Sequence, residues 1–170
     1  GEIALCILSA INIGKIRDVS DLKSLCDLSV RSLDELIDFQ GYPVEAAEIA
    51  TKARRSLGIG YIGLAHYLAK QGVKYEDPKA WELVHDLTEA FQYHLIESTV
   101  NLAKEKGACE YSDRTKYAQG ILPIDTYKKD VDELVPNNLK YDWETLRALV
   151  KEHGVRNSTL SAQMPSESSS

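Results

Sequence analysis

The three cysteines, Cys6, Cys26 and Cys109, are the residues best suited to redox or nucleophilic chemistry. Their number is odd and their spacings are long, which fits neither a disulfide scaffold nor a zinc knuckle. Cys26 is interpreted as a packing residue, because it falls near one apolar stripe of an expected helix together with Leu22, Leu25, Leu33, Leu36 and Ile37. Cys109 follows an expected helix end and is interpreted as incidental. Cys6 lies in the apolar run Glu2–Asn12, which predicts a strand whose side chains alternate between faces. Its thiol is therefore either a buried filler, the commoner case, or a redox group facing a cleft.

The C-terminal segment 164–170, MPSESSS, is a second candidate site. A serine-rich end is usually a disordered terminus. An extended segment followed by proline and hydroxyl side chains is also how a phosphate-binding loop begins, because backbone N–H groups and hydroxyls converge on the anion. The residues alone leave both interpretations open.

The segment Gly58–Gly63 matches the pattern G-x-G-x-x-G and raises the alternative of an NAD-dependent oxidoreductase. In that motif the glycines follow a buried strand and let a pyrophosphate approach a helix N-terminus. Here the preceding residues, TKARRSL, are polar and doubly basic. The favoured interpretation is that the glycines let a strand turn sharply into a packed helix.

Metal-binding and glycosylation patterns are weaker. Glu82 and His85 have the Glu-x-x-His spacing of di-iron bundles, but the sequence contains no second copy. His85 and His94 fall on opposite faces of one helix, and the four histidines are predicted to be surface or boundary residues. Asn157 begins a glycosylation sequon, which means little without a secretion signal.

Length and composition predict one domain, or a piece of a larger one, with a substantial core: 170 residues, 44% of them hydrophobic. The net charge of −6 argues against general nucleic-acid or membrane-surface binding. Neither an apolar run of membrane-spanning length nor a signal peptide is predicted, and the cysteine usage favours a reducing compartment, so a cytoplasmic protein is expected.

The pattern of expected elements is strand, helices, strand, helices, strand, which is typical of a mixed α/β sheet or barrel. A long helix over Pro78–Lys106 also leaves open a non-enzymatic helical interaction module. The strands are expected at Glu2–Asn12, Leu57–Gly60 and Val155–Gln163. Helices are expected from Asp18 or Ser20 to Gly41, over VEAAEIATKARR, from the end of the second strand to about Gly72, over Pro78–Lys106 and over WETLRALVKEH. A short hairpin is expected at ILPIDTY.

Four stretches taken together resemble the large, catalytic subunit of class I ribonucleoside-diphosphate reductase of the bacterial and phage type: GEIALC, RRSLGIG, GILPIDTYKKD and RNSTLSAQMPSESS. They occur in the family's order and with similar intervals from Gly1 to Ser170, and the last two are the most specific. The resemblance implies an α/β fold that is helix-rich, a single partial domain over residues 1–170. It would be roughly the C-terminal half of a ten-stranded α/β barrel.

The resemblance also implies site residues. Cys6 matches the strand cysteine of a redox pair that delivers two electrons to the ribose and becomes a disulfide. The diphosphate-binding loop is matched by Ser166, Glu167, Ser168 and Ser169, with Ser168 where this form often has threonine. The implied activity is reduction of ribonucleoside diphosphates to deoxyribonucleoside diphosphates by thiyl-radical chemistry.

Other parts of the implied machinery are expected outside this chain. The radical-bearing cysteine, in an N-x-C-x-E loop, is expected before Gly1, and the sites for ATP and dNTP effectors, the shuttle cysteines and the radical-relay tyrosines lie elsewhere. No cofactor is expected in this chain, since the family carries a metal-radical cofactor on a separate small subunit. The implied partners are that subunit, thioredoxin or glutaredoxin, and a second copy of the full subunit, without nucleic acid or membrane. The isolated 170 residues are expected to be inactive.

Overall fold

The computed structural model describes residues 1–163, 165 and 166. Two strands, β1 (Ile7–Asn12) and β2 (Leu57–Ile62), pair in parallel with Ile7 opposite Leu57. The helices are α1 (Asp21–Phe39), α2 (Glu45–Arg54), α3 (Leu64–Lys70), α4 (Pro78–Lys106) and α5 (Trp143–His153). Short 3-10 helices follow β1 and occupy the connection between α4 and α5.

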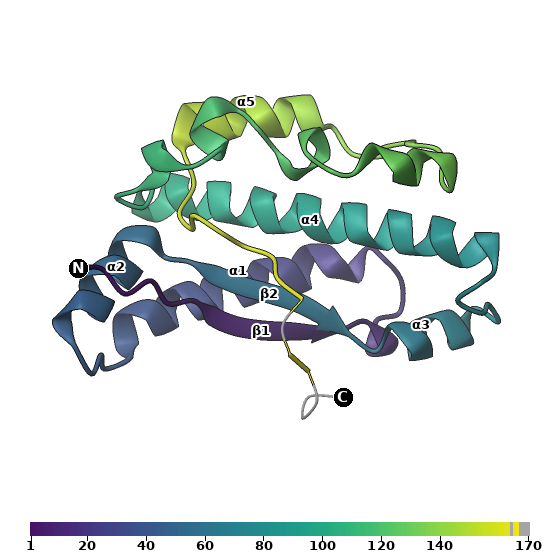
Figure 1. Cartoon of the computed structure of the whole chain (residues 1–170), viewed down its shortest axis with the longest axis horizontal. Coiled ribbons are helices and arrows are strands. Elements are labelled where there is room, and N and C mark those ends of the chain that lie inside the picture. The colour runs from purple at the N-terminus through teal and green to yellow at the C-terminus, as the bar shows by residue number, and fades with distance from the viewer. Residues whose placement is uncertain (164, 167–170) are drawn as a thin grey trace.

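Within the segment 155–162, residues 156–158 form a bend and residues 159–162 run beside the free edge of β2, in the place predicted for the third strand. The Leu57 amide donates to the Thr159 carbonyl at 3.0 Å, and the Ala162 amide donates to the Ile59 carbonyl at 3.1 Å. Ser161 forms a parallel bridge with Ile59. The order across the sheet is therefore β1, β2 and the segment 155–162, which Figure 1 shows in yellow beside β2.

Helices cover one face of this sheet. α1 packs against β1, β2 and α4, and α5 lies on the outer side of α4 (Figure 1). The core between these layers includes fully buried side chains from a strand and from two helices: Ile59, Leu22, Ile37, Leu87 and Leu95. Burial of these apolar side chains is the main driving force for packing the helices on this face of the sheet.

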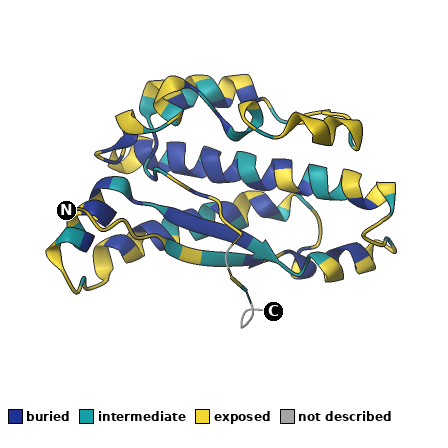
Figure 2. Ribbon diagram, in the orientation of Figure 1, coloured by how far each residue is buried: buried dark blue, intermediate teal, exposed yellow. Residues whose placement is uncertain are grey.

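The other face of the sheet is open. Parallel sheets are normally covered on both faces, but here Leu8 of β1 is 49% exposed. Figure 2 shows β2 largely buried and β1 more exposed. Over the described residues the fold is a helix-rich α/β unit with a small parallel sheet that does not close into a barrel.

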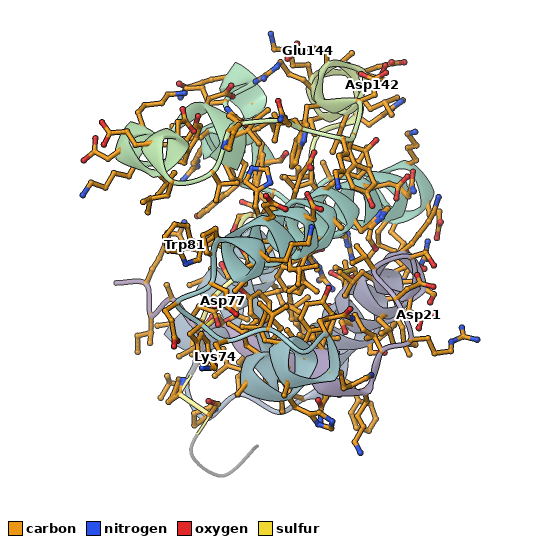
Figure 3. All side chains as sticks on the ribbon, turned by 90° about the vertical axis from the view of Figure 1, so that its right-hand side faces the viewer. Asp21, Lys74, Asp77, Trp81, Asp142 and Glu144 are labelled. Atoms are coloured by element: carbon orange, nitrogen blue, oxygen red, sulfur yellow. The ribbon has the colours of Figure 1, made fainter. Side chains whose placement is uncertain are left out.

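The ends of α4 and α5 follow local signals. α4 begins at Pro78 and ends before Gly107, whose φ of +88° is readily adopted by glycine. Asp142 caps α5 by accepting the Thr145 amide at 3.0 Å. The Asp77 carboxylate does not cap α4; it accepts the Lys74 amide at 2.8 Å in the preceding turn (Figure 3).

Two local expectations were wrong. The hairpin expected at ILPIDTY is replaced by a 3-10 helix at Pro123–Asp125, because the Asp125 carboxylate accepts the Leu122 amide at 2.7 Å and closes a tight local turn. Leu36, placed in the apolar stripe of α1, is 44% exposed, whereas Asp34 is fully buried. None of the helices in the described ranges is long and apolar enough to cross a membrane.

Candidate functional site on the open face of the sheet

Cys6 lies immediately before β1 with its side chain exposed. A Cβ atom added to Gly58 would lie 3.9 Å from the Cys6 Sγ, 2.6 Å from a methyl carbon of Leu8 and 3.4 Å from the Ala162 Cβ. Cys6, Leu8 and Ala162 therefore surround Gly58 on the open face. The Cys6 thiol is therefore not buried filler among the described residues, and its redox role stays a prediction.

The position of Cys6 is fixed through the backbone of its neighbours. The Ile7 amide donates to the Ser56 carbonyl at 3.3 Å, and the β1–β2 ladder continues from Ile7 opposite Leu57. Gly58 contributes no side chain beside the sulfur. A second sulfur or a small substrate group approaching Cys6 from the open face would meet the Gly58 backbone and a methyl group of Leu8.

The C-terminal segment reaches the same part of the sheet. Ala162 flanks Gly58, and the chain continues to Pro165, which is exposed, and Ser166, which is half-buried. Glu167, Ser168 and Ser169 lie outside the described residues. The structure thus brings Cys6 close to the strand that leads into the expected diphosphate loop, and the contacts of that loop stay a prediction.

The other two cysteines are packed in the interior, as predicted for Cys26; Cys109, interpreted from the sequence as incidental, is 5% exposed. Cys26 is fully buried and its thiol donates to the Phe91 carbonyl over 3.7 Å. Burial raises the pKa of Cys26 to about 12 and also raises the pKa of Cys109. Because the thiolate is the reactive form, burial disfavours redox chemistry at both sulfurs.

The glycine motif does not form a dinucleotide-binding turn. Gly58 and Gly60 lie within β2 itself, and the helix that follows has only seven residues. Gly63 has φ of +81°, and a Cβ there would lie 2.7 Å from the Asn12 Oδ1. The motif therefore serves the close approach of strand, turn and helix, and the NAD-binding alternative is not supported.

A buried polar network was not predicted from the sequence. Asp34, with 0% exposure, accepts the Arg55 Nε at 2.6 Å, the Asn157 Nδ2 at 3.0 Å and the Arg156 Nε at 3.2 Å. The available signal was an acidic residue within the buried stripe of α1, with arginines in two stretches that mark the resemblance. Asn157 is also fully buried, so the sequon is inaccessible to a glycosylating enzyme in the folded chain.

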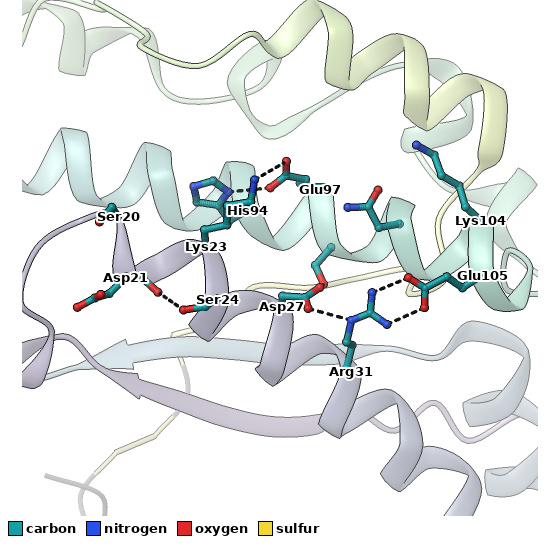
Figure 4. A pocket seen from close by; sticks show the side chains of 12 residues that line it. Ser20, Asp21, Lys23, Ser24, Asp27, Arg31, His94, Glu97, Lys104 and Glu105 are labelled. Atoms are coloured by element: carbon teal, nitrogen blue, oxygen red, sulfur yellow. Dashed lines mark hydrogen bonds and ion pairs between the residues drawn. The ribbon is translucent and has the colours of Figure 1, made fainter.

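A separate groove of about 740 Å³ lies between α1 and α4, on the side away from Cys6 (Figure 4). Several of its charges pair with one another: Arg31 binds Asp27 at 2.9 Å and Glu105 at 2.7 Å, and the His94 Nδ1 lies 2.9 Å from Glu97. His94 is 6% exposed, so the expectation that all histidines lie at the surface or boundary was wrong.

The parts of the chain that the structure describes contain no group of three or more His, Cys, Asp or Glu side chains arranged to hold a metal ion. The Glu82–His85 pair is therefore unsupported as a metal site within those residues. The open face around Cys6 is therefore the candidate site, because it carries the cysteine that the sequence analysis singled out for redox chemistry.

Comparison with known proteins identifies the family of the chain. The family model for the ribonucleotide reductase barrel domain matches residues 1–170, and the chain belongs to that family. It is 61% identical over its whole length to ribonucleoside-diphosphate reductase subunit alpha of Haemophilus influenzae and 47% identical over 99% of its length to that of Enterobacteria phage T4. It is also 55% identical, over 79% of its length, to ribonucleoside-diphosphate reductase 1 subunit alpha of Escherichia coli. The chain spans 22%, 22% and 18% of the length of these relatives.

Proposed function

We propose that residues 1–170 form one partial domain of the large subunit of an enzyme that reduces ribonucleoside diphosphates to deoxyribonucleoside diphosphates. The observation that carries the proposal is the exposed Cys6 thiol, which shares the open face of the sheet with Ala162 at the approach to the Ser166–Ser169 loop. The reaction class comes from the activity for which the relatives are named. Further barrel strands, contributed by the remainder of a relative-sized subunit, would cover this face.

Cys6 would act as one of two reducing thiols. In the net reaction two thiols lose two electrons and two protons and join in a disulfide, while the ribose C2′ exchanges its C–O bond for a C–H bond and the oxygen leaves as water. The second thiol and the radical-bearing cysteine would come from other parts of the subunit. The radical itself would be generated by a metal centre on a separate small subunit.

The Ser166–Ser169 loop would hold the substrate diphosphate. Backbone N–H groups and the hydroxyls of Ser166, Ser168 and Ser169 suit an anion. The Glu167 carboxylate would point away from the phosphates while its backbone amide points toward them. Fixing the diphosphate would orient the ribose toward Cys6, and such positioning accounts for a large part of enzymatic rate enhancement.

The proposed partners and location follow from the family. They are the radical-generating small subunit, thioredoxin or glutaredoxin as the reductant of the disulfide, a second copy of the full subunit, and ATP or dNTP effectors bound outside this segment, all in the cytoplasm. The alternative of a helical interaction module is disfavoured, because α4 has buried residues along most of its length and lies between α1 and α5. It therefore has no wide free face for a partner.

The test is Cys6→Ser in the full-length subunit. We expect turnover driven by thioredoxin or a small dithiol to fall to background, because one electron source is removed. Substrate binding, measured by equilibrium dialysis with a ribonucleoside diphosphate, should persist. Cys109→Ala is the matched control and should retain turnover. Normal turnover in the Cys6→Ser variant would defeat the assignment.

A further inference from the structure

The Asn157 side chain is a fully buried junction between distant parts of the chain. Its Nδ2 donates to the Asp34 Oδ1 at 3.0 Å and to the Arg55 carbonyl at 3.1 Å. Its Oδ1 accepts the Thr99 hydroxyl at 2.9 Å, and the Thr99 Oγ1 accepts the Asn157 amide at 2.9 Å. The start of the third extended segment is thus tied to α1, to α4 and to the residue that joins α2 to β2.

Arg55 has a backbone conformation that residues other than glycine rarely adopt. Its φ of +49° lies in the left-handed region, where a residue other than glycine is strained. Its guanidinium donates to Asp34 and to both oxygens of Asp38 at 2.9 and 2.8 Å. The network that holds Arg55 in this shape also presents its carbonyl to Asn157.

The backbone ladder beside β2 is regular around Ile59, which donates its amide to the Leu160 carbonyl and accepts the Ala162 amide, and it is irregular before that bridge. The Leu57 amide donates to Thr159 and the Ile59 amide donates to Leu160, so β2 advances two residues while the segment advances one. In a regular parallel ladder both would advance two. Asn157 and Leu160 are both buried although three residues apart, which agrees with this irregularity.

We propose that Asn157 is a positioning residue: through Arg55, Asp34 and Thr99 it sets the register of residues 157–162 against β2, and so the place of the diphosphate loop relative to Cys6. The inference rests on the proposed function. β1 is joined to β2 by its own regular ladder, so Cys6 keeps its place when the segment shifts. Loss of the Asn157 hydrogen bonds therefore weakens diphosphate binding and leaves the position of the Cys6 thiol unchanged.

Asparagine suits this position because it donates and accepts at once. Aspartate would present oxygen to the Asp34 carboxylate and to the Arg55 carbonyl, which are both acceptors. Alanine would leave the buried Asp34 and Thr99 groups with fewer partners. Thr99→Val removes the hydroxyl that bonds Asn157 twice while keeping the side-chain shape, so it is the milder variant.

The experiment compares Asn157→Ala and Thr99→Val in the full-length subunit with a control of similar stability loss. Val30→Ala is that control, since Val30 is fully buried on α1 and is not among the partners of the network. The Kd for a ribonucleoside diphosphate, KM, kcat, the rate of Cys6 alkylation by iodoacetamide and the thermal midpoint are measured for each.

We expect Kd and KM to rise on the order of tenfold for Asn157→Ala, with a smaller rise for Thr99→Val and an unchanged rate of Cys6 alkylation. Val30→Ala should lower the thermal midpoint without changing Kd. If Asn157→Ala does not fold, Thr99→Val decides the question. Variants that match Val30→Ala in Kd, or that change Cys6 alkylation as much as Kd, would overturn the inference. A wild-type subunit that binds no ribonucleoside diphosphate would instead defeat the proposed function.

Discussion

The two faces of the β1–β2 sheet differ in how far the rest of the described chain covers them. Toward α1 and α4, Ile11 is 6% exposed and Ile59 fully buried, and the polar groups of Asp34 have close partners. On the opposite face Leu8 is 49% exposed and the Cys6 thiol is accessible. The side chains of β1 alternate between these two faces: one face packs against the helices and stabilises the unit, and the other is the face on which the proposed function places the substrate.

The closed face should be most sensitive at its buried charges. Asp34→Ala is expected to lower the free energy of unfolding by about 3 to 5 kcal/mol, because it leaves the Arg55 guanidinium buried with fewer partners. Urea unfolding followed by the fluorescence of Trp81 and Trp143 measures the change. Arg17→Ala breaks an exposed ion pair with Asp21 and should leave the midpoint unchanged. Equal changes in the free energy of unfolding for the two variants would show that the Asp34 network contributes no more to stability than an exposed ion pair.

The two faces of β1 can be compared within a single strand. Ile11→Ala is expected to cost about 2 to 5 kcal/mol, because it opens a cavity in the core. Leu8→Ala should stay within about 0.5 kcal/mol in the 170-residue chain, since its side chain is half exposed. In the full-length subunit Leu8→Ala should become costly, because further polypeptide would cover this face. Equal costs in the short and full-length proteins would argue against that covering.

The smallest expected effect concerns pH at the edge of the closed face. The hydrogen bonds from Arg55 hold the pKa of the Asp38 carboxyl below its usual value, while burial opposes this shift. A lowered folded pKa gives a stabilisation that is present above the ordinary aspartate pKa of about 4 and lost as pH falls through the folded value. Because Asp38 is half exposed, screening limits this term to about 0.5 kcal/mol. The midpoint difference between wild type and Asp38→Asn should thus be constant near neutrality and shrink in acid; a difference that grows in acid would contradict the sign.

Local features of the fold were predictable from the sequence and distant ones were not. Pro78, Gly107 and Asp142 mark helix ends, because caps depend on residues a few positions apart. The contact of Asp34 with Asn157 crosses most of the chain, and no spacing rule reveals it. Glu89 likewise gives no local sign that its buried carboxylate accepts the Trp143 Nε1 at 3.0 Å.

The candidate site shows the same limit. Resemblance to the family pointed to Cys6, but the exposure of its thiol depends on which face of β1 the helices cover. The strand pattern leaves that choice open until long-range packing is known. The role of Gly58 beside the sulfur also needed the pairing of β1 with β2 and the approach of Ala162.

The most direct test of the central claim is to map disulfides after one turnover without external reductant, in a full-length subunit whose shuttle cysteines are replaced by serine, so that the disulfide cannot pass to them. The protein is alkylated under denaturing conditions and its peptides are analysed by mass spectrometry. The account predicts that Cys6 is found in a disulfide in proportion to the deoxyribonucleotide formed, while Cys26 and Cys109 are alkylated as free thiols. A full yield of product with Cys6 still free would contradict it.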